Sequence, residues 1–184
     1  MEQDTVLERK FARFGEGVRI EDSHLISGYA SLFGAVDQGR DVVAPGAYKR
    51  SLEALAVKGG SVKMLWQHDP TQPIGIWEDV FEDDRGLWVK GRLLDSVAKG
   101  REARALIEAG AIDGLSIGYR TVRATKNSEG HRLLTELELW EVSLVTFPML
   151  PSARVAAKSD ASDLDAALRD MAAAFAGARA DLAR

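Results

Sequence analysis

The sequence predicts an α+β fold in which a twisted or closed β-sheet, built mainly from antiparallel strands, is flanked by helices. Strand-like segments outnumber helical ones, two helical segments lie between strands, and short polar turns join neighbouring strands. Such turns are typical of antiparallel pairing, and this mixture of elements is typical of a sheet packed against helices. The length of 184 residues favours one folded domain with an appended segment.

The first third of the chain predicts a strand, a loop and a helix. Residues 18–33 alternate loosely between apolar and polar and include a glycine, which indicates a strand or strand pair with a bulge. Residues 34–46 are rich in Gly, Asp and Pro, so we expect an exposed loop. A helix is expected over residues 47–57, and the glycine pair at 59–60 ends it. Helical spacing gives this helix an apolar face made of Tyr48, Leu52 and Leu55.

Three strands are expected in the middle of the chain. Apolar and polar side chains alternate in residues 61–67, and this strand ends at residues 68–70, His-Asp-Pro. Residues 74–80 and 86–94 predict two further strands. The acidic turn between them makes a hairpin the simplest connection.

A second helix precedes the last strands. Asp95 or Ser96 can cap its start, and the helix is expected to run to Ala109, before a glycine. Leu106 and Ile107 are expected to face the core.

A long hairpin closes the predicted domain. Strands over residues 115–124 and 133–147 flank a polar tip at residues 126–131 that contains Asn and Gly. Strict alternation in the second strand predicts one face that carries Leu137, Leu139, Glu141, Ser143, Val145 and Phe147.

The composition changes after this hairpin. Residues 148–162 contain two prolines and many small side chains, and the sequence that follows them is rich in alanine. We therefore expect a folded domain over residues 1–150, and a linker with a C-terminal amphipathic helix over residues 151–184. Steps of four and three define the apolar stripe of that helix, which would either mediate self-association or dock on the body: Leu164, Leu168, Met171, Phe175, Ala178 and Leu182.

Composition excludes several functions. Lys and Arg total 24 against 28 for Asp and Glu, and a net charge of −4 argues against binding to a phosphate backbone. The absence of cysteine removes thiolate nucleophiles, disulfides and iron–sulfur clusters. The charged N-terminus lacks the apolar run of a signal peptide, and no stretch approaches the ~20 apolar residues of a membrane span. We expect a protein of the cytosol that binds neither membrane nor nucleic acid.

Three histidines are the candidates for acid–base chemistry. His24 follows Asp22-Ser23 in the early strand and is expected at a strand edge or turn. His131 lies in the polar hairpin tip and is expected to be solvated. His68 ends an apolar-faced strand, and such a strand end is where a scaffold can direct a side chain into a cleft.

Ser116 is the candidate nucleophile. It lies between Gly114 and Gly118, and alternate strand residues share a face, so the face of the serine lacks neighbouring side chains. The G-x-S-x-G spelling also matches the nucleophile elbow of α/β-hydrolases, but that motif requires a helix after the turn. Here a strand follows, so we reject that fold and keep the serine.

Glu141 interrupts a mostly apolar strand face. An unpaired buried carboxylate would cost several kcal/mol, so a partner is expected. Either a histidine or one of three arginines would serve: Arg92, Arg120 or Arg123.

Together these residues supply what nucleophilic acyl transfer requires. A serine hydroxyl needs a base to take its proton, a neutral imidazole can act as that base, and a carboxylate orients the imidazole. Zinc chemistry is disfavoured, because the sequence has one convincing histidine and no H-E-x-x-H motif.

Five blocks of sequence follow one another along the chain: 28–34 with Asp37, 43–48, 64–69 with 73–75, 114–119 and 140–145. With these blocks, residues 11–155 resemble the HK97-type prohead maturation serine proteases of tailed phages and phage-like gene-transfer particles. Tyr48 and Tyr119 are conservative aromatic departures from the family pattern.

The resemblance implies His68 as general base, Ser116 as nucleophile and Glu141 as the carboxylate that orients the histidine. It also implies an antiparallel β-barrel surrounded by helices, similar to the herpesvirus assembly protease, with residues 1–150 as the protease domain. That relative has a histidine as third member, which makes His131 the alternative to Glu141. Backbone amides or Arg120 are the candidates for stabilising the oxyanion.

The implied function is a serine endopeptidase that cleaves capsid-precursor and scaffold-like segments, and itself, inside an immature head in the host cytoplasm. It needs no cofactor and no metal. The expected partner is the precursor of the major capsid protein, with the C-terminal helix pairing to its scaffold segment, and residues 152–159 are a candidate self-cleavage site. Two alternatives remain open: a non-catalytic assembly module with a degenerate site, and an esterase or amidase for small substrates.

Overall fold

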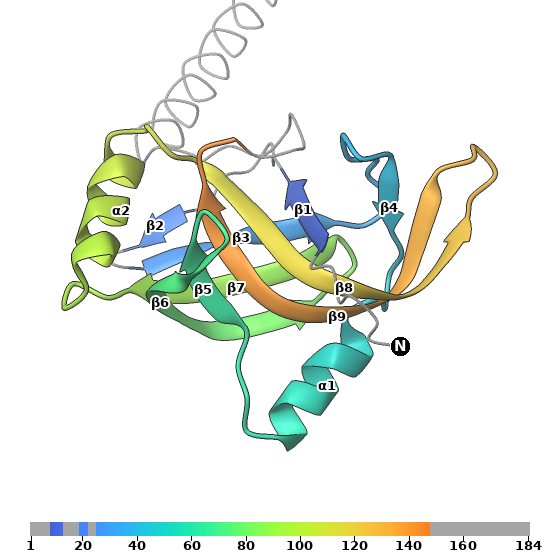
Figure 1. The fold of residues 1–184 in the computed structure, drawn as a ribbon, viewed down its shortest axis with the longest axis horizontal. Coiled ribbons are helices and arrows are strands. Elements are labelled where there is room, and N and C mark those ends of the chain that lie inside the picture. The colour runs from blue at the N-terminus through green and yellow to red at the C-terminus, as the bar shows by residue number, and fades with distance from the viewer. Residues whose placement is uncertain (1–7, 13–18, 22–24, 148–184) are drawn as a thin grey trace, which may run out of the picture.

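A computed structural model describes residues 8–12, 19–21 and 25–147 of the chain. In these residues it contains a mostly β architecture with two helices (Figure 1). The helices are α1 (Lys49–Val57) and α2 (Ala98–Glu108). The strands are β1 (Glu8–Ala12), β2 (Arg19–Glu21), β3 (Leu25–Leu32), β4 (Asp41–Val43), β5 (Lys63–Trp66), β6 (Asp69–Glu82), β7 (Gly86–Leu93), β8 (Gly114–Lys126) and β9 (Arg132–Val145).

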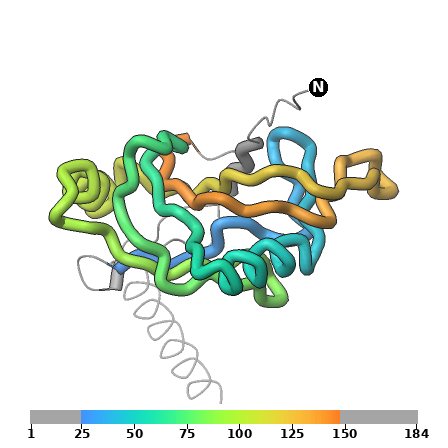
Figure 2. The backbone as a smooth tube through the Cα atoms, turned by 60° about the horizontal axis from the view of Figure 1, so that its bottom comes forward, coloured from blue at the N-terminus to red at the C-terminus, as the bar shows by residue number. Residues whose placement is uncertain are grey.

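The strands form one sheet with the order β1-β8-β9-β5-β6-β7-β3-β2, and β4 pairs with β9 outside this path. The sheet curls so that β8 and β9 arch over β3, β6 and β7, while α1 and α2 lie at its margins (Figures 1 and 2). The order ends at β1 and β2, so the described strands form a curled half-barrel. The expected α+β class is confirmed. Most pairs are antiparallel, but β4 and β5 each run parallel to β9.

An apolar core fills the concave side of the sheet. It gathers buried side chains from most strands and from α2, and the partly buried Leu52 and Leu55 of α1 pack against it. The largest side chains in it with under 2% exposure are Tyr48, Tyr119, Ile26, Met64, Ile74, Leu87, Leu115, Ile117, Leu134, Leu137 and Leu139. None of the helices in the described part of the chain is long and apolar enough to cross a bilayer.

A bulge in β9 corrects the predicted alternation of this strand. Gly118 pairs with Glu141 but its neighbour Tyr119 pairs with Leu139, so Trp140 is an extra residue in the ladder. Directly paired residues share a face, and Gly118 and Tyr119 point to opposite faces. Leu139 is therefore in the core while Glu141 lies on the other face. The expectation that the Glu141 carboxylate interrupts the apolar face is therefore wrong. The bulge at Trp140 moves Glu141 to the face opposite the core.

The structure corrects two other local expectations. The loop expected over residues 34–46 contains the buried strand β4, whose Asp41 accepts hydrogen bonds from Nε and Nη2 of Arg132 at 2.9 and 2.6 Å. Neither Asp95 nor Ser96 caps α2, which starts after Val97 without a side-chain cap.

The predicted inward face of α2 is half right. Ile107 is 3% exposed and lies in the core, whereas Leu106 is 36% exposed. Adjacent helical residues point about 100° apart, so only one of the two reaches the core. The expected linker and amphipathic helix over residues 151–184 lie outside the described residues.

Candidate active site

His68 lies in the tight turn between β5 and β6, where two consecutive residues have left-handed backbone conformations. The φ angles are 52° at Gln67 and 63° at His68, and non-glycine residues pay ~1–2 kcal/mol each in this region. Contacts to β9 and to Thr146, which follows it, stabilise the turn. Gln67 N–H donates to the Leu144 carbonyl at 2.9 Å, and its side-chain amide donates to Thr146 Oγ1 at 2.6 Å. His68 N–H donates to Ser143 Oγ at 3.1 Å.

Asp69 anchors the residues that follow the histidine. Its Oδ1 accepts hydrogen bonds from the hydroxyl and the backbone N–H of Thr71 at 2.6 and 2.8 Å, and its Oδ2 accepts one from Gln72 at 2.7 Å. These hydrogen bonds lower the pKa of the Asp69 carboxyl below its usual value, and the bond from the Thr71 hydroxyl has the largest effect. The charged form of Asp69 therefore fixes the start of β6 beside His68.

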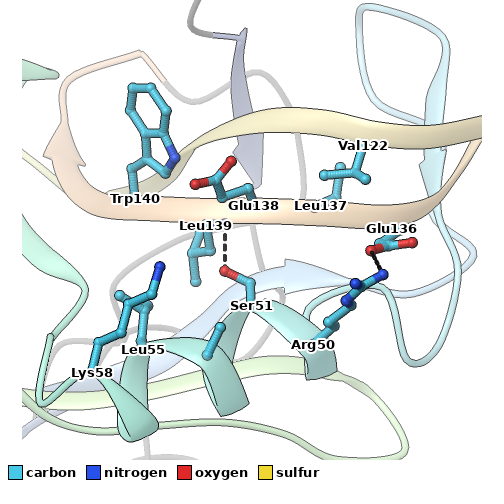
Figure 3. A pocket seen from close by; sticks show the side chains of 11 residues that line it. Arg50, Ser51, Leu55, Lys58, Val122, Glu136, Leu137, Glu138, Leu139 and Trp140 are labelled. Atoms are coloured by element: carbon cyan, nitrogen blue, oxygen red, sulfur yellow. Dashed lines mark hydrogen bonds and ion pairs between the residues drawn. The ribbon is translucent and has the colours of Figure 1, made fainter.

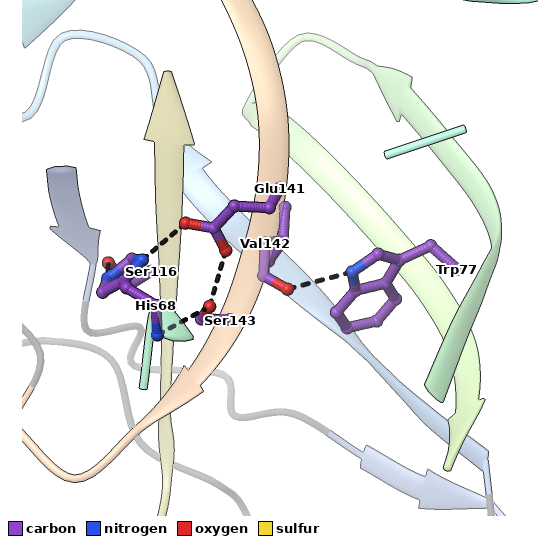
Figure 4. Close-up of polar contacts among 6 residues, drawn as sticks. All are labelled: His68, Trp77, Ser116, Glu141, Val142 and Ser143. Carbon is purple, nitrogen blue, oxygen red and sulfur yellow. Dashed lines mark hydrogen bonds and ion pairs between the residues drawn. The ribbon is translucent and has the colours of Figure 1, made fainter. Parts of the chain in front are cut away.

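Ser116 lies on β8, and β8 pairs with β9 so that Ser116 is opposite Ser143. Its Oγ is 2.6 Å from Nε2 of His68, and the serine has no exposed surface. The turn after β5 thus brings the imidazole onto the face of β8 that the serine occupies (Figure 4).

Glu141 completes the contact series on the same face. Its Oε1 is 2.5 Å from Nδ1 of His68, and its Oε2 accepts a hydrogen bond from Ser143 Oγ at 2.5 Å (Figure 4). A Cβ atom on Gly118 would lie 2.0 Å from Glu141 Oε1. The bare face expected beside Ser116 is therefore filled at Gly118 by the carboxylate of Glu141.

The sequence left the partner of Glu141 open, and in the structure that partner is His68. The three alternative arginines bind other carboxylates: Arg92 with Glu78 at 3.0 Å, Arg120 with Glu138 at 2.8 Å and Arg123 with Glu136 at 3.8 Å. Because Arg120 is held by Glu138 on an exposed part of the sheet, its pairing does not favour an oxyanion role.

Among the described residues, His131 does not join this cluster. His131 lies in the turn at the far end of the β8–β9 hairpin, and its Nδ1 is 3.3 Å from a carboxylate oxygen of Glu129. That turn is about ten residues, or roughly 30 Å of extended strand, from Ser116. His24 lies outside the described residues.

Ser143 is a residue of this cluster that sequence reasoning did not single out. It is fully buried, donates to the Glu141 carboxylate and accepts from the His68 backbone. The available signal was its position two residues after Glu141, on the same face of the strand.

A separate groove of about 480 Å³ lies between α1 and β9 (Figure 3). Leu55, Leu137 and Trp140 contribute apolar surface, while Arg50 and Glu136 form an ion pair at 3.1 Å on its margin. His68, Ser116 and Glu141 do not line this groove. Among the described residues, no group of three or more metal-ligand side chains is positioned to hold an ion.

The sequence matches the model of the caudovirus prohead serine protease family over residues 16–167, which is most of the chain. The chain belongs to this family. The family expected from the five sequence blocks is thus confirmed. The prohead protease of Enterobacteria phage HK97 is 30% identical over 150 residues, which cover 80% of this chain and 65% of that protein.

Two further comparisons found a second sequence relative and a solved structure with a similar fold. The capsid polyprotein of Pseudomonas phage PAJU2 is 30% identical over 140 residues, covering 70% of this chain and 19% of the polyprotein. The chain therefore spans less than two thirds of the length of either curated relative. The capsid assembly protease of bacteriophage T4 has a similar fold, with a TM-score of 0.59 and 19% identity over 77% of this chain and 98% of that chain.

Proposed function

We propose that this prohead protease family member is a serine endopeptidase in which Ser116 is the nucleophile, His68 the general base and Glu141 the orienting carboxylate. One observation supports the proposal above all others: the unbroken series from Glu141 Oε1 through both ring nitrogens of His68 to Ser116 Oγ, with separations of 2.5 and 2.6 Å. A nucleophile, a base and an orienting group within hydrogen-bond reach are the requirements of serine acyl transfer.

In this mechanism, neutral His68 accepts the hydroxyl proton at Nε2 while Ser116 Oγ bonds to the carbonyl carbon of the scissile peptide. The tetrahedral intermediate collapses to an acyl-enzyme, the C–N bond breaks, and the proton on Nε2 passes to the leaving amine. Water then attacks the acyl carbon, again with His68 as base, and releases the carboxylic acid product. Glu141 accepts a hydrogen bond from the Nδ1–H group throughout, remains ionised, and stabilises the imidazolium that forms.

We expect the substrate to be the precursor of the major capsid protein, since the relatives are named as a prohead protease and a capsid polyprotein. The site of action is then the immature capsid in the host cytoplasm. Incubation of the chain with the capsid precursor and with small esters separates the proposals. Cleavage of the precursor at defined bonds supports an endopeptidase, while turnover of esters alone points to the esterase alternative.

The non-catalytic assembly module remains the second candidate, because Ser116 is fully buried in this structure. It predicts that the chain binds the capsid precursor without cleaving it and without reacting with a fluorophosphonate, which phosphonylates activated serines. Cleavage within residues 152–159 stays a further prediction. An intact C-terminus by mass spectrometry, equal to that of the Ser116→Ala variant, would exclude it.

Gly118→Ala is expected to lower the cleavage rate by about two orders of magnitude. The added methyl would overlap Oε1, Cδ and Cγ of Glu141 at 2.0, 2.7 and 2.9 Å, so the carboxylate must move away from His68. Displacements of about 1 Å at such positions cost roughly 10²-fold in rate. Gly39→Ala is the matched control, because its Cβ would meet only the Asp37 carboxylate in a distant loop. Equal rates for the two variants would contradict the role given to Glu141.

Ser143→Ala is expected to lower kcat about 10- to 100-fold while leaving KM unchanged, because Ser143 positions Glu141 and His68 rather than binding substrate. The change removes the donor to Oε2 and leaves the buried His68 N–H without its acceptor. An orphaned buried group costs ~1–3 kcal/mol, so the melting temperature should fall as well. Ser143→Thr keeps the hydroxyl and should restore most of kcat. A variant that loses stability but keeps full kcat would limit Ser143 to a packing role.

A further inference from the structure

The three proposed catalytic side chains are closed to solvent in this structure. Ser116 is 0% exposed, Glu141 3% and His68 4%. A scissile carbonyl carbon must come within about 3–3.5 Å of the serine Oγ to react. Part of the molecule must therefore move before a peptide can reach Ser116.

The strand beside Ser116 is β1. It pairs antiparallel with β8 in a register that places Phe11 opposite Ser116, Ala12 opposite Leu115 and Glu8 opposite Tyr119. The other edge of β8 is paired with β9 from Gly114 to Lys126. Access to the main chain of β8 next to the nucleophile is therefore controlled by β1.

Its place at one end of the sheet, next to the strand that carries Ser116, allows β1 to leave without breaking another strand pair. It is the terminal strand of the order β1-β8-β9-β5-β6-β7-β3-β2, and among the described strands it pairs with β8 alone. Its departure would leave every other strand pair intact. A peptide that replaced it as an antiparallel strand would re-form the same kind of main-chain hydrogen bonds, so the exchange costs little net hydrogen-bond energy.

We propose that the edge of β8 from Leu115 to Tyr119 binds the substrate as an extended peptide strand, and that β1 occupies this position as an internal competitor. The inference rests on the proposed protease function. A tethered segment competes at an effective concentration of about millimolar. A substrate segment with the same intrinsic affinity as β1 must reach that concentration to displace it, so the enzyme would be restrained when dilute and released where substrate is crowded.

The double variant Lys10→Pro/Phe11→Pro tests this competition in the full chain. Neighbouring N–H groups of a strand point to opposite sides, so one of the two prolines removes a donor that faces β8. We expect Ser116 of this variant to react with a fluorophosphonate about tenfold faster than in the wild type. This factor corresponds to a loss of ~1.4 kcal/mol in the free energy that holds β1 on β8. In that reaction Ser116 Oγ bonds to phosphorus, fluoride leaves, and His68 takes the hydroxyl proton.

A synthetic peptide of residues 6–14, added in trans to the proline variant, should slow the labelling again. The same peptide with proline at positions 10 and 11 is its matched control and should have no effect. Labelling of the wild type as fast as the variant, or equal effects of the two peptides, would overturn the inference and leave the protease proposal intact. No labelling of Ser116 in any sample would instead overturn the protease proposal, and with it the substrate role of this edge.

Hydrogen exchange gives a readout that does not depend on catalysis. In the Ser116→Ala background, the proline pair should speed exchange of those amides in residues 115–119 that face β1, and the wild-type peptide should restore their protection. Amides across the β8–β9 pair serve as the internal control and should not change. Unchanged exchange in residues 115–119 would show that β1 does not protect this edge.

Discussion

Replacement of Ser116 by alanine is expected to reduce cleavage of the capsid precursor by about 10⁴-fold or more. The variant lacks the oxygen that forms the acyl-enzyme, and what remains is the smaller acceleration from substrate binding and oxyanion stabilisation. His68→Ala should have an effect of the same order, because no other described histidine is within reach of Ser116. Co-expression with the precursor, followed by mass spectrometry of the products, measures both.

Ser27→Ala is the matched control for the loss of a buried serine hydroxyl, because Ser27 is 5% exposed and lies on β3. It should cleave the precursor at the wild-type rate. All three variants should keep a cooperative melting transition, which separates loss of chemistry from loss of fold. Continued processing of the precursor by the Ser116→Ala protein would show that another group carries the reaction.

Glu141→Gln is expected to reduce the cleavage rate by up to about 10⁴-fold while the precursor still binds. Glutamine has nearly the same shape, so the contact with His68 Nδ1 persists, but the amide can present its NH₂ group there. That donor favours the tautomer with the proton on Nε2, which cannot accept a proton from Ser116, and it does not stabilise an imidazolium. Single-turnover rates with the precursor at saturation measure the effect.

Glu138→Gln is the control for this change. Glu138 lies three residues earlier on β9, is 42% exposed in its side chain and pairs with Arg120. Losing an exposed ion pair costs at most ~1 kcal/mol and should leave the rate unchanged. A Glu141→Gln variant as active as Glu138→Gln would remove Glu141 from the mechanism and leave His68 and Ser116 as a dyad.

Local sequence signals were enough to predict the elements that are bounded by a short turn or a glycine. The β8–β9 hairpin and α1 are close to the predicted ranges, since a short polar turn or a terminal glycine marks each one. The turn of the β6–β7 hairpin is also where it was predicted, but β6 begins at Asp69 rather than at residue 74. The three-residue strand β4 had no such signal, because it is stabilised by parallel pairing with β9, far along the chain. The bulge at Trp140 was hidden for a similar reason, since it depends on the register between two strands.

The chemistry of the candidate site was more predictable from residue types than its geometry. His68, Ser116 and Glu141 each broke a local pattern, which is why they were singled out. The partner of Glu141 could not be decided from the sequence, because the turn at Gln67 and the side chain of Ser143 bring the imidazole to it from another strand. Ser143 itself broke no pattern, since a serine in a strand has many ordinary explanations.

The most direct test is covalent labelling with a fluorophosphonate, which shows which residue reacts and whether its reaction depends on His68. The purified chain is treated with a fluorophosphonate for an extended period, digested, and mapped by mass spectrometry alongside His68→Ala and Ser116→Ala. The account predicts the adduct on Ser116, its absence in Ser116→Ala, and a rate about 10³-fold or more lower in His68→Ala. An adduct on a different serine, or equal labelling of Ser116 with and without His68, would contradict it.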